Sequence, residues 1–160
     1  MRSILTCLIK ALVLTMFAVA ATYAAIDNSV KVPDLAQPGL NLAPEDVVAV
    51  VIQALANNDD PYPDAGIETT FRFASPQNRA NTGPLERFSQ MVKRYPYRDM
   101  VDHRQSDLSE VVFVGENAYL VVKLIVQDGR EVAYAFRLSR QSEGRYRGMW
   151  MTDAVWPVNQ

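Results

Sequence analysis

Three residues in the C-terminal half of the sequence have the side-chain types of an acid–base site. Asp153 follows the strand-like run Met-Trp-Met-Thr, and the strand register proposed below places it on one face with Tyr134 and Tyr119. A carboxyl group in an apolar pocket has a raised pKa and can take up a proton, while a neutral phenol can donate to an oxyanion. These residues predict a small-molecule isomerase, dehydratase or cyclase-like enzyme, unless Asp153 is simply a solvated acid near a strand end.

A second group of polar side chains lies just before a predicted helix. Ser75, Asn78, Arg79 and Thr82 combine hydrogen-bonding groups with a cation, close to a helix start at Gly83. The free N–H groups of a helix N-terminus favour an anion, so these residues predict a ligand-binding loop. The alternative is that the same residue types cap the neighbouring helices, which is their common structural use.

Metal and cofactor chemistry have little support in the residue types. His103 is the only histidine and Cys7 the only cysteine. Asp102 would point to the opposite side of a strand from His103, and the acidic loop at residues 57–64 lacks the glycine and glutamate spacing of an EF-hand. We therefore expect no metal and no cofactor, and we expect His103 to be an ordinary surface or hydrogen-bonded residue.

The first 25 residues have the pattern of a secretory signal peptide. Arg2 and Lys10 supply positive charge, an apolar run covers residues 11–21, and small side chains suited to cleavage follow it. This pattern predicts export, to the periplasm or, in a photosynthetic organism, to the thylakoid lumen. In the alternative, residues 4–26 remain as a membrane anchor, and we expect membrane contact only through this segment.

Composition indicates one globular domain and argues against nucleic acid as a partner. Hydrophobic residues make up 49% of the 160-residue chain, enough for a sizeable core. Acidic residues outnumber basic ones by 18 to 16, and the cation-rich section at residues 71–104 is interspersed with acids. A nucleic-acid surface would instead require a basic patch or a long run of lysine and arginine.

Residues 44–158 are expected to form this domain after a flexible linker at residues 26–43. Pro44 suits the first position of a helix, since it has a fixed φ and needs no N–H partner there. Pro76 and Pro96 are expected to end the next two helices. The helices are predicted at residues 44–57, 65–74 and 84–95, with a loop at residues 77–82 between the last two.

Residues 111–156 are typical of an antiparallel β-meander. The dipeptide Asp128-Gly129 favours a two-residue type I′ turn, which would pair Tyr119 with Leu138 and Leu120 with Arg137. In this register both faces of the hairpin are largely apolar, so we expect the helices to cover one face and a partner subunit or a ligand the other. A four-residue turn at residues 141–144 would then place Met149 and Met151 beside Phe136 and Tyr134, and Trp150 over Ala135.

Three helices followed by a strongly bent antiparallel meander resemble the cone-shaped α+β fold, a cystatin-like roll, of the nuclear transport factor 2-like superfamily. This superfamily includes ketosteroid isomerase and polyketide cyclase-like proteins. The sequence FRFASPQNRANTGPLERF at residues 71–88 and the closing GMWMTDAVWP further resemble a small uncharacterised family of bacteria and photosynthetic eukaryotes. The superfamily resemblance implies a pocket between helices and concave sheet, and dimerisation through the convex face. No residue here matches the isomerase pattern, so no catalytic role is carried over.

Taken together, these features predict an exported, single-domain, non-enzymatic module for ligand binding or assembly. We expect a homodimer formed through the sheet face and a small apolar ligand with a polar or anionic group. The enzyme that would use Asp153 with Tyr134 or Tyr119 is the alternative.

Overall fold

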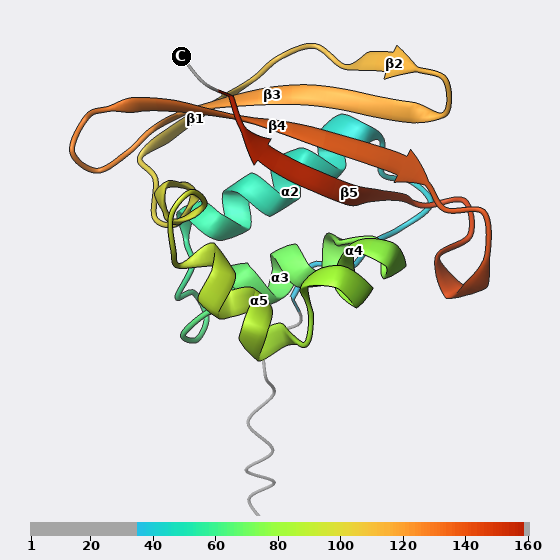
Figure 1. The fold of residues 1–160 in the computed structure, drawn as a ribbon, viewed down its shortest axis with the longest axis horizontal. Helices are drawn as coiled ribbons and strands as arrows, with labels where there is room; N and C mark the ends of the chain where they lie inside the picture. Colours follow the sequence, from blue (N-terminus) through green and yellow to red (C-terminus); the bar gives the residue numbers. More distant parts are fainter. Residues whose placement is uncertain (1–34, 159–160) are drawn as a thin grey trace, which may run out of the picture. The chain divides into compact units, whose positions relative to one another are not determined.

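The computed structural model describes residues 35–158, in which a group of helices lies against an antiparallel sheet (Figure 1). The predicted signal segment at residues 1–25, the alternative anchor at residues 4–26 and the first part of the predicted linker lie outside the described residues. The described part of that linker, residues 35–43, contains neither helix nor strand. Within residues 35–158, no helix combines the length and the apolar character that a membrane crossing requires.

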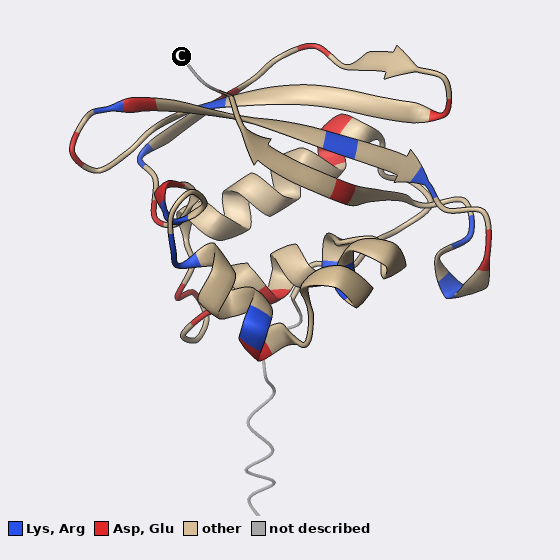
Figure 2. Cartoon of the chain, in the orientation of Figure 1, with Lys and Arg blue, Asp and Glu red and all other residues tan. Residues whose placement is uncertain are grey.

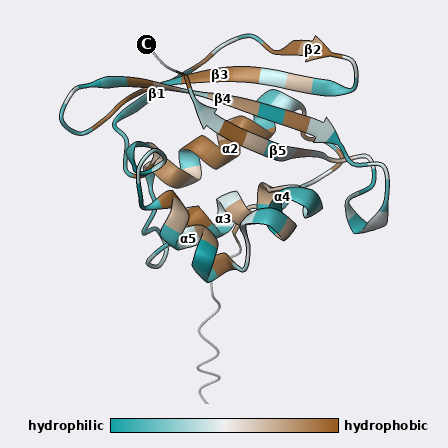
Figure 3. Ribbon diagram, viewed as in Figure 1, coloured by the Kyte–Doolittle hydropathy of each residue, from teal (hydrophilic) through white to brown (hydrophobic). Residues whose placement is uncertain are grey.

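The α-helices of the described residues all come before the sheet in the chain. They are α2 (Pro44–Ala56), α3 (Ala65–Phe73), α4 (Pro76–Thr82) and α5 (Leu85–Val92), followed by the short 3₁₀ helix η1 (Arg98–Met100). α2 starts at Pro44 as predicted, and the Asp46 carboxylate accepts a hydrogen bond from the Ala43 N–H at 2.9 Å. Figure 3 shows that much of α2 is hydrophobic, which agrees with its burial against the sheet.

Residues 77–82 belong to α4, so the prediction of a loop there is wrong. Ser75 is the N-cap of this helix, and its hydroxyl accepts a hydrogen bond from the Asn78 N–H at 3.2 Å. Proline ends a helix that precedes it but is favoured in the first turn of one that follows it. Pro76 does both, because α3 ends just before it and α4 begins at it. α5 also differs from the prediction at both ends, with Pro84 rather than Gly83 at its N-cap and Val92 rather than Tyr95 as its last residue, so Pro96 does not end it.

The sheet is built from antiparallel pairs in the order β1-β3-β4-β5, and β2 pairs with the remaining part of β3. The strands are β1 (Gln105–Leu108), β2 (Val112–Val114), β3 (Asn117–Ile125), β4 (Glu131–Arg140) and β5 (Trp150–Pro157). A second 3₁₀ helix, η2 (Gly144–Tyr146), lies in the β4–β5 connection. With helices first, then an antiparallel sheet, the predicted α+β class is confirmed (Figure 1).

The β3–β4 register differs by one residue from the predicted one. Leu120 pairs with Phe136, and Tyr119 rather than Leu120 pairs with Arg137. The loop between the strands has three residues, because the Val126 N–H bonds to the Arg130 carbonyl and the Gly129 N–H to the Val126 carbonyl, both at 3.0 Å. Such a loop is a type I turn followed by one left-handed residue, here Gly129 with a φ of 87°. The prediction of a two-residue turn at Asp128-Gly129 is therefore wrong.

In the observed register, the two faces of the hairpin differ in burial, as the alternation of buried and more exposed residues along β3 and β4 shows. The face toward the helices carries the apolar side chains of the core, among them Leu120, Val122, Leu124, Tyr134 and Phe136. The outer face is mixed, since Lys123, Glu131 and Arg137 are exposed there beside apolar neighbours. The expectation of two largely apolar faces is thus corrected, because it rested on the wrong register.

β5 is also displaced from its predicted position. The connection from β4 extends to Met149, whose carbonyl accepts from the Gln141 N–H at 2.9 Å, so the four-residue turn is wrong. Phe136 consequently pairs with Val155 and Ala135 with Trp156, and neither Met149 nor Met151 lies opposite Phe136 or Tyr134. Two glycines explain the longer path, since Gly144 and Gly148 both adopt positive φ, at 66° and 85°.

Candidate functional site

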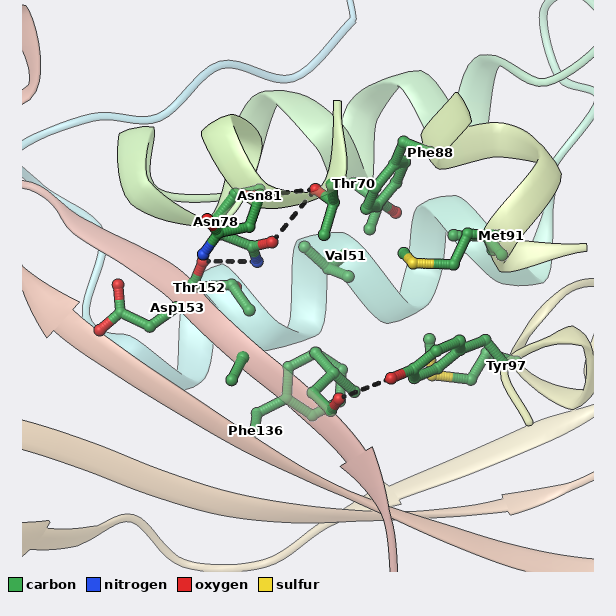
Figure 4. A pocket seen from close by; sticks show the side chains of 16 residues that line it. Val51, Thr70, Asn78, Asn81, Phe88, Met91, Tyr97, Phe136, Thr152 and Asp153 are labelled. Atoms are coloured by element: carbon green, nitrogen blue, oxygen red, sulfur yellow. Dashed lines mark hydrogen bonds between the residues drawn. The ribbon is translucent and has the colours of Figure 1, made fainter. Parts of the chain in front are cut away.

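A cavity of about 240 Å³ lies between α2, the helices α3 to α5 and the inner side of β5 (Figure 4). Most of its wall is apolar, and one end is polar. The apolar wall includes Val51, Phe88, Met91, Val92, Tyr97, Met100, Phe136 and Val155, and the polar end Thr70, Asn78, Asn81, Thr82, Thr152 and Asp153. This combination of an apolar body and a few grouped polar side chains is typical of a small-molecule site.

The polar end is assembled where α4 meets β5. Ala74 and Thr152 form an isolated parallel bridge, and the Ser75 N–H donates to the Thr152 carbonyl at 2.8 Å. The same carbonyl accepts the side-chain amide of Asn78 at 3.1 Å, and the Thr82 hydroxyl donates to the Asn78 carbonyl at 2.8 Å (Figure 4). Backbone and side chains together therefore fix the position of α4 on the free edge of β5.

The Thr152 hydroxyl is the one buried side-chain oxygen or nitrogen in residues 35–158 that has no hydrogen-bond partner. The residue is only 5% exposed and it lines the cavity. A buried hydroxyl without a partner costs roughly 1–3 kcal/mol, so proteins seldom keep one without a use. Sequence reasoning missed Thr152, although a threonine inside a predicted buried strand, next to Asp153, was a signal that could have directed attention to it.

Asp153 lies at a β-bulge. Arg137 pairs with Ala154 and Leu138 with Thr152, so the intervening Asp153 has no partner on β4. Its carboxylate is half-buried at the rim of the cavity, forms no salt bridge with any residue from 35 to 158, and points away from the centre of the cavity in Figure 4. A bulge re-aims side chains in this way, and it is not readable from the strand pattern.

The two tyrosines predicted to act with Asp153 lie elsewhere. Tyr134 is buried under the sheet, where its hydroxyl donates to the Pro96 carbonyl at 2.6 Å; burial, with the negative charge of Asp99 second, raises its pKa to about 12. Tyr119 is on the outer face. The tyrosine at the cavity is Tyr97, whose hydroxyl donates to the Val155 carbonyl at 3.3 Å. The structure therefore does not bring the proposed acid–base group together.

The four residues of the predicted ligand-binding loop have three different environments. Asn78 and Thr82 line the cavity. Ser75 is buried as the N-cap of α4, which is the capping role that the sequence left open for it. Arg79 points instead toward the β4–β5 connection, where its guanidinium donates to the Tyr146 hydroxyl at 3.0 Å.

The remaining candidates have structural partners. His103 is buried, and its Nδ1 lies 2.8 Å from the Met100 carbonyl oxygen. In the acidic loop, Asp64 bonds to Lys93, Ser89 and Asn58, and the Lys93 ammonium chiefly lowers the pKa of its carboxyl group. Within residues 35–158, no three His, Cys, Asp or Glu side chains are grouped as a metal site would require.

These features define an α+β domain with a mostly apolar internal pocket that has one polar end. The family model described as "Domain of unknown function (DUF4864)" matches residues 42–158, and the chain belongs to this family. The sequence-based expectation of an uncharacterised family is confirmed at that level. No curated protein and no solved structure matches the chain.

Proposed function

We propose that this domain binds one small, mostly apolar molecule in the cavity between α4, α5 and β5, without catalysing a reaction. The observation that carries the proposal is the apolar cavity with one polar end, which includes Thr152, whose buried hydroxyl has no partner within residues 35–158. A ligand with one hydrogen-bonding group would satisfy this hydroxyl once the side chain turns toward the cavity. The apolar side chains across the cavity, such as Met91, Met100 and Phe136, would contact the rest of the molecule.

The size of the cavity limits the ligand. An apolar cavity of about 150 Å³ accommodates benzene, and sites for drug-sized molecules start at roughly 300 Å³. The present cavity, about 240 Å³, falls between these values. It therefore suits a molecule of about ten non-hydrogen atoms, such as a substituted single ring or a small bicyclic compound.

The charge of the wall favours a neutral ligand. Asp153 is the sole charged side chain among the residues that line the cavity, and no arginine, lysine or histidine is among them. An anion in the cavity would be desolvated without a cation to compensate. Of the polar and anionic groups expected from the sequence, a neutral hydroxyl, carbonyl or N–H facing Thr152 and Asn81 fits this wall better.

We also propose that the domain is related to the nuclear transport factor 2-like superfamily. The order of helices before an antiparallel sheet, and a pocket between the two, support it. The isomerase alternative has no comparable support, since the hydroxyl of Tyr134 is bonded to Pro96 and Tyr119 lies on the outer face.

Binding can be tested with indole, a neutral bicyclic molecule with one N–H group, titrated into the full chain by calorimetry. We expect saturable binding, weakened about tenfold by Thr152→Val, because one hydrogen bond of roughly 1–1.5 kcal/mol is lost. Thr69→Val is the matched control: Thr69 is also buried but does not line the cavity, so it should leave the affinity unchanged. Native mass spectrometry of the exported protein should show a retained small molecule. An empty protein that also fails to bind indole would contradict the proposal.

Export is the second part of the proposed function, and the signal pattern at residues 1–25 supports it. N-terminal sequencing of the protein isolated from its own cells distinguishes the two alternatives. We expect a chain that begins near Ile26 in the exported fraction. A chain in the membrane fraction that still contains residues 4–26 would favour the anchor instead.

A further inference from the structure

Two arginines from separate parts of the chain meet at one tyrosine. The Arg79 guanidinium, on α4, donates to the Tyr146 hydroxyl at 3.0 Å, and its Cζ lies 4.8 Å from the centre of the ring. Arg145, in η2, donates to the same hydroxyl, and its Cζ lies 4.6 Å from the same ring centre. Both cations thus share a single neutral phenol as their partner.

Neither guanidinium is neutralised by a carboxylate within residues 35–158. Other arginines there do form salt bridges, as Arg72 does with Glu68 at 2.6 Å and Arg130 with Asp128 at 2.8 Å, whereas Arg79 and Arg145 form none. Two like charges held at one hydroxyl repel each other, and a phenol carries no negative charge that would neutralise them. Each guanidinium also has five N–H donors. The bond to the single Tyr146 oxygen uses few of them, so the others can bind a further acceptor.

The backbone around the two cations is fixed by hydrogen bonds. On one side, Asn78 attaches α4 to the Thr152 carbonyl at 3.1 Å. On the other, the Gly148 N–H donates to the Gln141 carbonyl at 2.8 Å and closes the β4–β5 connection that carries Arg145. Figure 2 shows basic residues on this connection and on α4. The two guanidiniums are therefore held close together by a preorganised backbone, which lowers the entropy cost of binding a shared ligand.

We propose that Arg79, Arg145 and Tyr146 form a binding site for a phosphate-type oxyanion. Planar guanidinium forks match tetrahedral oxyanions with paired N–H···O bonds, and two forks can each take two oxygens of one phosphate group. The negative charge would also remove the repulsion between the two arginines. This site is separate from the cavity, because neither arginine lines that cavity. It does not depend on the ligand proposed there.

Titration of the full chain with inorganic phosphate at low ionic strength tests the site, with NMR signals of the Tyr146 ring and the arginine side chains as the readout. We expect saturable shifts, and about tenfold or greater weakening by Arg79→Gln or Arg145→Gln, since each removes charge-assisted hydrogen bonds. Arg147→Gln is the matched control: it removes the same charge from the same connection, but the Arg147 side chain forms neither the hydrogen bond nor the stacking contact with Tyr146 that Arg79 and Arg145 form. The phosphate affinity of the Arg147→Gln variant should differ from that of the wild-type protein by less than about twofold.

Two variants keep the test independent of folding. Arg145 is exposed, so Arg145→Gln does not disturb packing, and Arg79→Lys keeps the charge while removing the fork. Each should retain the thermal unfolding midpoint yet bind phosphate more weakly. Vesicles with phosphatidylglycerol distinguish a lipid phosphate from a free one: retention of the protein on them, lost in Arg145→Gln, assigns the site to lipid headgroups. The proposal is overturned if wild-type protein binds neither probe, or if Arg147→Gln weakens binding as much as Arg145→Gln does.

Discussion

At the scale of single residues, Thr152 and Thr69 form a natural pair for measuring what an unpartnered hydroxyl costs. Both are buried, but the Thr69 hydroxyl donates to the Ala65 carbonyl at 2.9 Å, whereas that of Thr152 has no partner within residues 35–158. Without ligand, Thr152→Val should leave the free energy of unfolding unchanged or raise it by about 1 kcal/mol, because no hydrogen bond is lost. Thr69→Val should lower it by about 1 kcal/mol.

Urea denaturation of the two variants and the wild-type protein measures this difference. Threonine and valine have nearly the same shape, so the comparison reports on the hydroxyl groups rather than on packing. Equal destabilisation by the two substitutions would mean that the Thr152 hydroxyl has a partner in the protein after all.

Tyr134 gives the residue-scale prediction for pH. Its pKa is raised from 10.0 to about 12, first by burial and then by Asp99, so the folded state favours the neutral phenol. The stability that this provides is fully present below pH 10 and is lost as the pH rises toward 12. We expect the free energy of unfolding to fall across this window. Tyr134→Phe should flatten the fall, whereas Tyr119→Phe, which changes a side chain on the outer face of the sheet, should not. Chemical denaturation at a series of pH values between 9 and 12 is the measurement.

Only part of the candidate site could be found from residue types. Asn78, Thr82 and Asp153 were predicted as functional candidates and do line the cavity. Thr152 was missed because its place in the wall depends on a contact with Asn78, 74 residues away in the chain. Its place in a predicted strand next to Asp153 was a local signal, but no local pattern encodes the contact with Asn78. Arg79 was expected to share a site with Asn78, but neighbouring positions on a helix point in different directions.

At the scale of elements, the sequence specified the helix α2 and the antiparallel meander, because capping residues and apolar periodicity are local signals. It did not specify the register. Loops of two and three residues both suit Asp128-Gly129, and the choice between them moves every side chain of β4 by one position relative to β3. Core packing selects the register. The observed register places Phe136 opposite Leu120 rather than opposite Val121, so that Phe136 and Leu120 both lie on the helix-covered face.

The contact between α2 and α3 depends on a glycine. A Cβ at Gly66 would lie 2.1 Å from the Ala54 carbonyl oxygen, a backbone atom that a rotamer change cannot move. Gly66→Ala should therefore push the two helices apart and lower the free energy of unfolding by about 2 kcal/mol or more. In Gly39→Ala, the added methyl would meet only the end of the Asn41 side chain, so little change is expected. Thermal unfolding of the two variants compares them directly, and equal midpoints would contradict the close packing of α2 on α3.

At the scale of the whole molecule, the outer face of the sheet is the main surface that the described helices leave uncovered (Figure 1). Val121, Ala135 and Trp156 form one row across β3, β4 and β5 on this face, and Trp156 is 40% exposed. Val112 and Val114 extend the apolar surface at the edge, each about 60% exposed. Charged side chains such as Lys123 and Arg137 lie among them. A stable interface combines an apolar centre with polar surroundings in this way.

We propose that two copies associate through this outer face. A specific dimer needs to bury about 800 Å² per subunit, an area that the outer face of the five-stranded sheet, with Trp156 on its edge strand β5, can supply. Sedimentation velocity of the exported protein at micromolar concentration should show a dimer. Trp156→Asp should convert it to a monomer, because a carboxylate would be buried without a partner within the contact. Tyr95→Asp places the same charge at an exposed position outside the sheet and should leave the dimer intact. A wild-type monomer at this concentration would rule out the association, and the apolar row would then be an ordinary solvent-exposed part of a mixed surface.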